Sequence, residues 1–230
     1  MLKIGVYDLR SYHKIMRIII MAGGKAKRWT GDKPKQLTEF FGEPLLKRTI
    51  RLLSEAKVLG TDIVVTMSRE LSGIMRTPEY REKFDGYPYN AVTGFVSDDN
   101  IQEIDRFLSC KSQWEGDTIF LYGDVFYTDE AINKILSTFL LPVTFFGRRR
   151  GNNMKPYGEM FGLRADTSDP KFENILLEIR AREKNGEARG LGWDVYRAYN
   201  KSNFVELDAR LEDFDKVEEV NIYKKIYGIA

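Results

Sequence analysis

The chain has 230 residues, the length of one large α/β domain, and its 36 Lys and Arg nearly balance its 34 Asp and Glu, for a formal net charge of +2. This balance excludes an acidic disordered chain and argues against a dedicated nucleic-acid-binding protein, which is usually strongly basic. No stretch reaches the roughly 18 consecutive apolar residues that a membrane-spanning helix needs. Cys110 is the only cysteine, so we expect no disulfide framework and a reducing, cytoplasmic location. The only histidine, His13, falls outside the main pattern, which removes the histidine base of hydrolytic triads.

Residues 1–15 read as an N-terminal extension, and residues 16–230 as one domain. In that domain, short β-branched runs alternate with amphipathic segments of helix length, which predicts an α/β fold with a mostly parallel central sheet covered by helices on both faces. Residues 67–97 predict only a short helix and irregular structure, and residues 22–36 and 147–156 read as loops. In chain order, the predicted strands are 17–21, 62–66, 117–122, 143–146, 157–164 and 203–207. The predicted helices are 44–56, one that starts at Asp98 or Asp99 and runs to 108, 129–139, 171–184, 191–199 and 213–227.

The loop after the first predicted strand is rich in glycine and in basic residues. Gly23 and Gly24 follow the strand directly, and residues 25–35 carry five basic side chains against one acidic one. Glycines let backbone N–H groups approach a ligand closely, and such loops bind anions. The spacing differs from that of the Walker A and dinucleotide-binding loops. We therefore expect a phosphate chain to bind here, with a solvated basic turn as the alternative.

The motifs of the first quarter resemble a known family. Met-Ala-Gly-Gly-x-x-x-Arg at 21–28, Lys-Pro-Lys-Gln-Leu at 33–37 and Gly-Glu-Pro-Leu-Leu at 42–46 are similar, in order and spacing, to the start of nucleotidyltransferases with a GT-A-like, Rossmann-like fold. That family includes sugar-phosphate nucleotidylyltransferases, methylerythritol-phosphate and phosphocholine cytidylyltransferases, and the molybdenum-cofactor guanylyltransferase. The resemblance implies that Arg28 and Lys35 are catalytic and neutralise the NTP phosphates. The nucleotide-binding residues that it implies are Met21, Ala22, Gly23, Gly24, Lys25 and Gly123.

A carboxylate ends the third predicted strand, in Leu121-Tyr122-Gly123-Asp124-Val125. Ligands of α/β sheets bind at the carboxyl ends of strands, and carboxylate oxygens suit Mg²⁺, with Mn²⁺ as a substitute. The family has a metal-binding Asp at this point, which implies that Asp124 is a metal ligand. The resemblance implies a second metal ligand at Asp208, with Asp194 as its rival. Residues 208–219 hold six acids against two bases, so part of this segment also fits a solvated helix start.

The middle of the chain should contact the second substrate. Three consecutive arginines and a lysine lie between Gly147 and Pro156 with no acid among them, so this segment is either a phosphate-binding loop or a solvated basic loop. The following Lys-Pro-Tyr-Gly-Glu places a base and an acid before an apolar strand. The candidate acceptor-binding residues are Arg148, Lys155, Glu159 and Asp194.

Together these features predict a Mg²⁺-dependent enzyme that transfers a nucleoside monophosphate from an NTP to a phosphorylated small molecule, such as a sugar phosphate, and releases pyrophosphate. A likeness of Asp99-Asn100 to the acceptor region of cytidylyltransferases favours CTP, while the other NTPs stay open. A glycosyltransferase that uses a nucleotide sugar and a non-catalytic NTP-binding module are the alternatives. The Asp-x-Asp motif that is usual in such glycosyltransferases is absent at this point, because Val125 and Phe126 follow Asp124. We expect no nucleic-acid or membrane partner, and either a monomer or a dimer.

Overall fold

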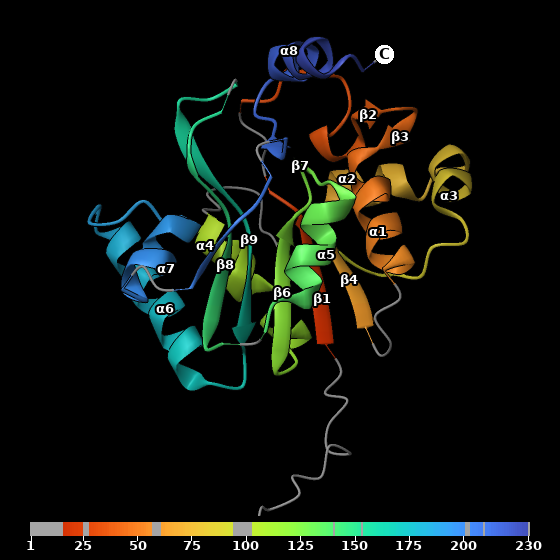
Figure 1. Cartoon of the computed structure of the whole chain (residues 1–230). Coiled ribbons are helices and arrows are strands. Elements are labelled where there is room, and N and C mark those ends of the chain that lie inside the picture. The colour runs from red at the N-terminus through yellow and green to blue at the C-terminus, as the bar shows by residue number, and fades with distance from the viewer. Residues whose placement is uncertain are drawn as a thin grey trace, which may run out of the picture.

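The apolar, β-branched run MRIIIMA forms β1 (Met16–Ala22), which lies inside a seven-stranded sheet (Figure 1). The computed structural model describes residues 16–24, 28–56, 61–93, 103–139, 141–152, 154–200, 203–208 and 210–229. The predicted N-terminal extension, Lys25 and Asp98 to Asn100 lie outside the described residues. The expected α/β fold with a mostly parallel sheet is confirmed. Within the described residues, no helix combines the length and the apolar character needed to cross a membrane.

The strands of the sheet lie in the order β10-β8-β9-β6-β1-β4-β5. β1 pairs in parallel with β4 and β6, β4 with β5, and β10 with β8, while β9 is antiparallel to both of its neighbours. The carboxyl ends of the parallel strands therefore meet at one edge, which is where ligands bind in such sheets. The other strands are β4 (Thr61–Met67), β5 (Asn90–Thr93), β6 (Asp117–Tyr122), β8 (Val143–Arg150), β9 (Tyr157–Asp166) and β10 (Phe204–Glu206).

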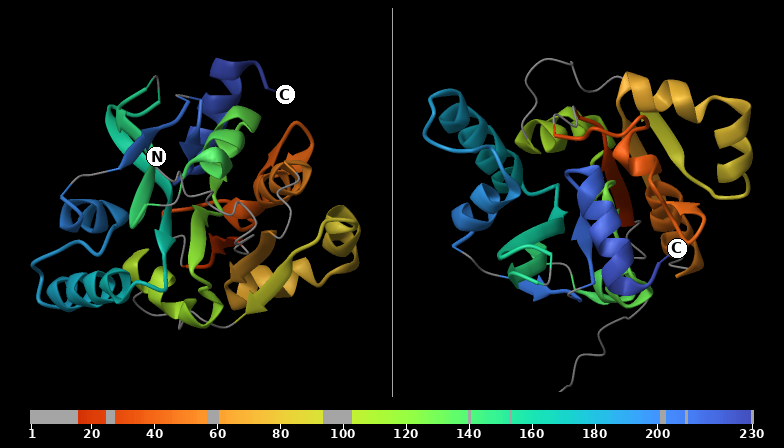
Figure 2. Two further views of the ribbon diagram at one scale, coloured as in Figure 1. Left: turned by 60° about the horizontal axis from the view of Figure 1, so that its bottom comes forward. Right: turned by 90° about the horizontal axis from the view of Figure 1, so that it is seen from above.

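Helices cover both faces of the sheet (Figure 2). α1 packs against α5 on one face, whereas α4 packs against α6, and α6 against α7, on the other. Each helix buries one apolar stripe; α6, for example, buries Phe172, Ile175, Leu176 and Ile179 at the spacing predicted from the sequence. The helices are α1 (Leu45–Glu55), α2 (Arg69–Met75), α3 (Pro78–Phe84), α4 (Glu103–Ser109), α5 (Asp129–Ser137), α6 (Pro170–Lys184), α7 (Gly192–Ala198) and α8 (Val217–Tyr227), with single 3₁₀ turns η1 (Lys35–Leu37) and η2 (Lys111–Gln113).

A second, smaller apolar cluster includes side chains of α8, the helix that lies beyond the end of the main sheet in Figure 1. It joins two short antiparallel pairs, β2 (Glu39–Phe40) with β3 (Glu43–Pro44), and β7 (Val125–Phe126) with β11 (Glu212–Asp213). Aromatic rings dominate this cluster: the ring centroid of Phe40 lies 5.2 Å from that of Phe214 and 5.7 Å from that of Tyr223. The cluster fixes the late segment at 211–215 beside the carboxyl end of β6.

The structure differs from the sequence prediction at several boundaries. β8 continues to Arg150, so residues 147–150 are strand and not loop. The last helix begins at Val217, because residues 212–213 pair with β7 as a strand instead of opening the helix. The segment at 67–97 is more regular than expected, with α2, α3 and β5 in it. The two short pairs at 39–44 and 125–126 with 212–213 were not predicted, since strands of two residues carry almost no periodicity.

Candidate active site

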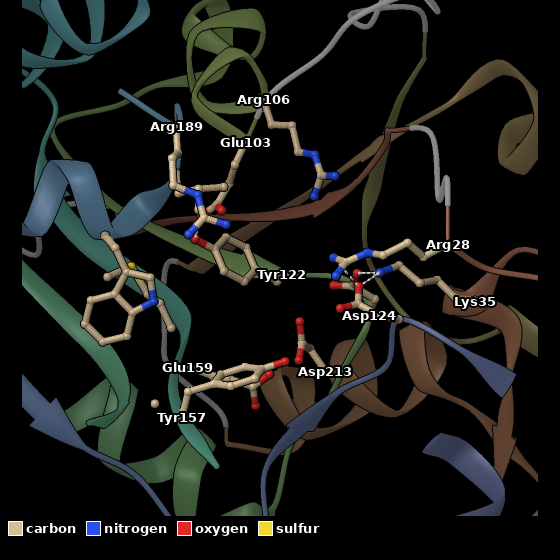
Figure 3. A pocket seen from close by; sticks show the side chains of 15 residues that line it. Arg28, Lys35, Glu103, Arg106, Tyr122, Asp124, Tyr157, Glu159, Arg189 and Asp213 are labelled. Carbon is tan, nitrogen blue, oxygen red and sulfur yellow. Dashed lines mark hydrogen bonds and ion pairs between the residues drawn. The ribbon is translucent and has the colours of Figure 1, made fainter. Parts of the chain in front are cut away.

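A pocket of about 670 Å³ opens at the carboxyl end of the parallel strands (Figure 3). Figure 3 shows Arg28 and Lys35 reaching Asp124 from one side, Tyr157, Glu159 and Asp213 on a second side, and Arg106, Arg189 and Glu103 on a third. The remaining lining residues are Tyr122, Gly158, Met160, Leu191, Trp193 and Asp215. Charged groups of both signs thus converge on one cavity, which suits an anionic ligand with a cation.

The glycine-rich loop starts where β1 ends, directly beside the end of β6. The backbone N–H of Gly123 donates to the carbonyl of Met21 (3.0 Å), and the Gln36 side chain donates to the carbonyl of Ala22 (3.0 Å). A Cβ on Gly123 would lie 2.8 Å from the Cβ of Ala22, so the missing side chain allows the two strand ends to pack together. This close packing, more than access for a ligand, explains the glycine at 123. It brings the loop at 23–24 next to Asp124.

The structure brings the predicted residues Arg28, Lys35 and Asp124 together. Lys35 extends from η1 and forms an ion pair with Asp124, and both side chains are nearly buried, at 11% and 10% exposure. The same ammonium lies 3.9 Å from a carboxylate oxygen of Asp215, which also pairs with Arg28 at 2.8 Å. Burial, followed by the nearby Asp213 carboxylate, raises the pKa of Asp215. Two carboxylates therefore share one ammonium, and each is held in the pocket.

Sequence reasoning missed Asp213 and Asp215 as pocket residues. Antiparallel pairing of β11 with β7 places Asp213 opposite Val125, the residue after Asp124, so the late segment runs alongside the end of β6. Phe214 is fully buried in the small apolar cluster, which turns its two acidic neighbours toward the pocket. The alternation acid–apolar–acid at 213–215 is the signal that could have identified this strand.

Asp208 and Asp194, the two expected candidates for the second metal ligand, do not line the pocket. Asp208 accepts hydrogen bonds from the backbone and side chain of Arg210, which lower its pKa. Asp194 caps α7: it accepts from the N–H of Leu191 (3.1 Å) and from Arg197 (2.7 Å). Both carboxylates are thus engaged outside the pocket, whereas Asp213 and Asp215 line it together with Asp124.

Three of the four expected acceptor contacts belong to a buried network beside the pocket. Cross-strand pairing places Arg148 opposite Glu159, and the two form an ion pair. Arg148 also bonds Glu212 (3.1 Å), while Lys155 bonds Glu159 (2.6 Å), Glu212 (3.0 Å) and Asp213 (2.5 Å). We call Arg148, Lys155, Glu159, Glu212 and Asp213 the buried network. Arg148 is 3% exposed, so it is not a free cation for an acceptor phosphate, as the sequence had suggested.

The carboxylates of Glu159, Glu212 and Asp213 lie close enough to one another to hold a metal ion. Their oxygens, however, surround the Lys155 ammonium, so the cation of this cluster comes from the chain itself. These three carboxylates face only two cations, Arg148 and Lys155. The charge balance therefore favours one proton shared among the carboxylates. Burial, then the Asp213 carboxylate, raises the pKa of Glu159 to about 10. Burial would raise the pKa of Asp213 too, but a hydrogen bond from Glu159 and the charge of Lys155 outweigh it and lower it to about 2.

The third wall of the pocket is held by the Glu103 carboxylate. It accepts hydrogen bonds from the Tyr122 hydroxyl and from the N–H of Gly192 (3.0 Å), so it ties α4 to the end of β6 and to the start of α7. Burial raises the pKa of Glu103 and that of Tyr122. The next residue, Trp193, lies in the pocket and stacks on Phe204 with a centroid separation of 5.7 Å. Neither Trp193 nor the pocket-lining Arg189 was identified from the sequence.

Comparison with known proteins identifies the class of domain that the sequence motifs resemble. Residues 18–139 match the model of the MobA-like NTP transferase domain, which is more than half of the chain. The chain is 26% identical over 190 residues to the bifunctional protein GlmU of Prochlorococcus marinus. This similarity covers 78% of the chain and 40% of the length of that relative.

Two solved structures share the fold at low sequence identity. A UDP-glucose pyrophosphorylase in complex with UDP-glucose superposes with a TM-score of 0.64 at 12% identity, covering 93% of this chain and 98% of that one. The 4-diphosphocytidyl-2C-methyl-D-erythritol synthase of Anaerococcus prevotii superposes with a TM-score of 0.62 at 13% identity, covering 94% and 99%. The similarity thus extends over nearly the whole chain.

Proposed function

Because this chain belongs to the family of MobA-like NTP transferase domains and is a nucleotidyltransferase, we propose that it transfers a nucleoside monophosphate to a phosphorylated small molecule. An oxygen of the acceptor phosphate attacks the α-phosphorus of the NTP, a new phosphorus–oxygen bond forms, and the bond to the β-phosphate breaks to release pyrophosphate. The acceptor phosphate is already anionic at neutral pH, so the reaction needs no base from the protein. The remaining work is positioning and charge neutralisation.

The single observation that carries this proposal is the Lys35–Asp124 ion pair beside the glycine loop. A lysine held at this place can shift from Asp124 to the α-phosphate once the nucleotide binds, and its charge then stabilises the transition state. Arg28 is 67% exposed and pairs only with Asp215 among the described residues, so it is free to turn toward the departing pyrophosphate. The backbone of Gly23 and Gly24, together with Lys25, would hold the phosphate chain.

The donor set of the pocket fits a divalent cation with oxygen ligands. Asp124 and Asp215 both lie within ion-pair distance of the same Lys35 ammonium, so they already surround one point of positive charge. We propose that these two carboxylates hold Mg²⁺, with Asp213 beside them. The ion would polarise the phosphoryl oxygens and neutralise their charge.

The lining of the pocket and the names of the relatives support a proposal for the two substrates. We propose CTP as the nucleotide, because one structural neighbour is a diphosphocytidyl synthase and because Asp99-Asn100 resembles the acceptor region of cytidylyltransferases. The acceptor, a sugar phosphate or a related phosphorylated alcohol, would lie against Trp193, Tyr157 and Arg189, which replace Arg148 as the acceptor wall. We further propose a cytoplasmic setting, since the single cysteine, Cys110, is buried and unpaired.

The test is a matrix of CTP, UTP, GTP, ATP and dTTP against a panel of phosphorylated sugars and alcohols, each with Mg²⁺. Pyrophosphate release that requires both an NTP and one acceptor supports the proposal. Release of a nucleoside diphosphate from a nucleotide sugar would indicate a glycosyltransferase. Tight NTP binding with no turnover for any acceptor would indicate a binding module.

A further inference from the structure

Arg106 is a pocket cation that the proposed reaction has not yet used. It extends from α4, whose neighbouring side chains Ile104 and Phe107 are fully buried in the core. The N–H of Ile104 donates to the carbonyl of Gly190 (2.9 Å), and Glu103 ties the same turn to Tyr122. These contacts hold in place the turn of α4 that carries Arg106. Its guanidinium projects into the pocket toward Arg28 (Figure 3).

The guanidinium of Arg106 lies against the backbone of Gly24. A Cβ on Gly24 would stand 2.8 Å from its Nη2, 2.9 Å from its Nε and 3.0 Å from its Cζ, so the arginine occupies the space that a side chain at 24 would need. Gly24 also has a φ of +113°, which favours glycine. The loop and the arginine thus fit each other, and the guanidinium lies directly beside the backbone of Gly24.

The charges around Arg106 do not balance within the described part of the chain. Asp124 pairs with Lys35, Asp215 with Arg28, and Asp213 with Lys155. Arg106 has no ion pair with any described residue, and its Nε is buried without a hydrogen-bond partner. The Glu103 carboxylate interacts electrostatically with Arg106, but its hydrogen bonds, both to Oε1, come from Tyr122 and Gly192. A guanidinium without an acceptor is costly in a partly buried place, and this guanidinium lines the pocket, where a phosphate oxygen could accept from its terminal N–H groups.

We propose that Arg106 binds a phosphate group of the nucleotide where that group crosses Gly24. This proposal rests on the proposed function, since it assigns a further residue to the same pocket. Arg106 would form, together with Arg28 in the same pocket, a clamp on the phosphate chain. The acceptor phosphate is the other possible source of the same anion, and the experiment separates the two.

The first arm uses inorganic tripolyphosphate as the probe, so that it does not depend on catalysis. Binding is measured by calorimetry with Mg²⁺ for the wild type, Arg106→Gln, Arg106→Lys and the exposed control Arg182→Gln on α6. Loss of one charge-assisted contact predicts about tenfold to a hundredfold weaker binding for Arg106→Gln, a smaller loss for Arg106→Lys, and no change for Arg182→Gln. Thermal midpoints of all four proteins check the fold, and Arg106→Lys serves if Arg106→Gln does not fold.

The second arm measures steady-state kinetics with the acceptor found in the matrix above. We expect Arg106→Gln to raise KM for the NTP with little change in KM for the acceptor. Unchanged tripolyphosphate binding, or a rise confined to KM for the acceptor, would overturn the proposal. A wild type that binds tripolyphosphate through Arg106 but never releases pyrophosphate would refute the proposed function alone.

Discussion

Two groups of ion pairs lie side by side at the carboxyl end of the sheet, and they differ in whether their cations line the pocket. Both cations of the pocket pairs, Lys35–Asp124 and Arg28–Asp215, line the cavity, whereas Arg148 and Lys155 do not. The buried network around Lys155 has side chains that are 0% to 9% exposed, apart from Asp213. A cation in an open pocket can exchange its carboxylate for a ligand, whereas a cation enclosed by carboxylates cannot. The first group is therefore suited to binding, and the second to holding the first in place.

Asp213 connects the two groups. Its carboxylate pairs with Lys155, its backbone carbonyl accepts from the same ammonium (2.8 Å), and its side chain lines the pocket. The network thus fixes the strand that carries Asp215. Changes in the pocket pairs should abolish turnover without loss of stability. Changes in the buried network should lower stability before they affect turnover.

The largest effect is expected for Asp124→Asn. Removal of this charge deletes a proposed metal ligand and leaves Lys35 with a weaker partner, so kcat/KM should fall on the order of a thousandfold or more. The measurement is Mg²⁺-dependent pyrophosphate release, with circular dichroism to confirm that the fold is retained. Turnover within tenfold of the wild type would remove Asp124 from the mechanism.

Lys155→Met should have the opposite effect and mainly lower the stability of the fold. Loss of this ammonium leaves Glu159 and Glu212 with Arg148 alone and removes the ion pair of Asp213, and breaking a buried ion pair in this way costs about 3–5 kcal/mol of unfolding free energy. The matched change in the pocket is Arg28→Gln, which should cost less than about 1 kcal/mol because the Arg28 side chain is largely exposed. Urea denaturation of the two variants compares them, and equal losses would contradict the division into two groups.

Glu159→Gln should change how stability depends on pH. The pKa of Glu159 is raised to about 10 in the folded protein and is about 4.3 when unfolded, so between these values the folded state holds a proton that the unfolded state has released. The stabilisation is complete below about pH 4.3 and declines as pH rises toward 10. The glutamine cannot titrate, so the slope of unfolding free energy against pH should be flatter in the variant. Parallel slopes over pH 5 to 9 would show that Glu159 is ionised in the network.

The smallest effect is expected for Asp208→Asn. This carboxylate pairs with Arg210 outside the pocket and is 28% exposed, so the variant should lose less than about 1 kcal/mol of stability and keep turnover within about twofold. Thermal denaturation and pyrophosphate release measure the two quantities. A large loss of turnover would restore Asp208 as the second metal ligand.

The sequence predicted the half of the site that lies in contiguous motifs. The glycine loop, Lys35 and Asp124 each follow a strong strand or a distinctive run, and their convergence follows from parallel strands ending at one edge. Most helices and strands of the sheet were likewise readable, since their periodicity extends over two turns or several residues. These features depend on local pattern, which a single sequence records.

The other half depends on contacts between distant residues. Asp215 reaches the pocket because two-residue strands at 125–126 and 212–213 pair with each other, and no local pattern specifies that partner. Three arginines in a row read as either a phosphate-binding loop or a solvated loop, yet continuation of β8 turns Arg148 inward to Glu159 and leaves Arg149 exposed. Arg106 reads as an ordinary helix residue until the glycine loop is placed beside it.

The most direct test of the account is the binding of Mn²⁺, as a paramagnetic substitute for Mg²⁺, to the protein with a non-hydrolysable CTP analogue. Electron paramagnetic resonance would report the free ion during titration of the wild type and Asp215→Asn. We expect the wild type to bind Mn²⁺ with the nucleotide, and Asp215→Asn to bind it at least about tenfold more weakly. Equal Mn²⁺ affinity in the two proteins would contradict the site built from Asp124, Lys35 and Asp215.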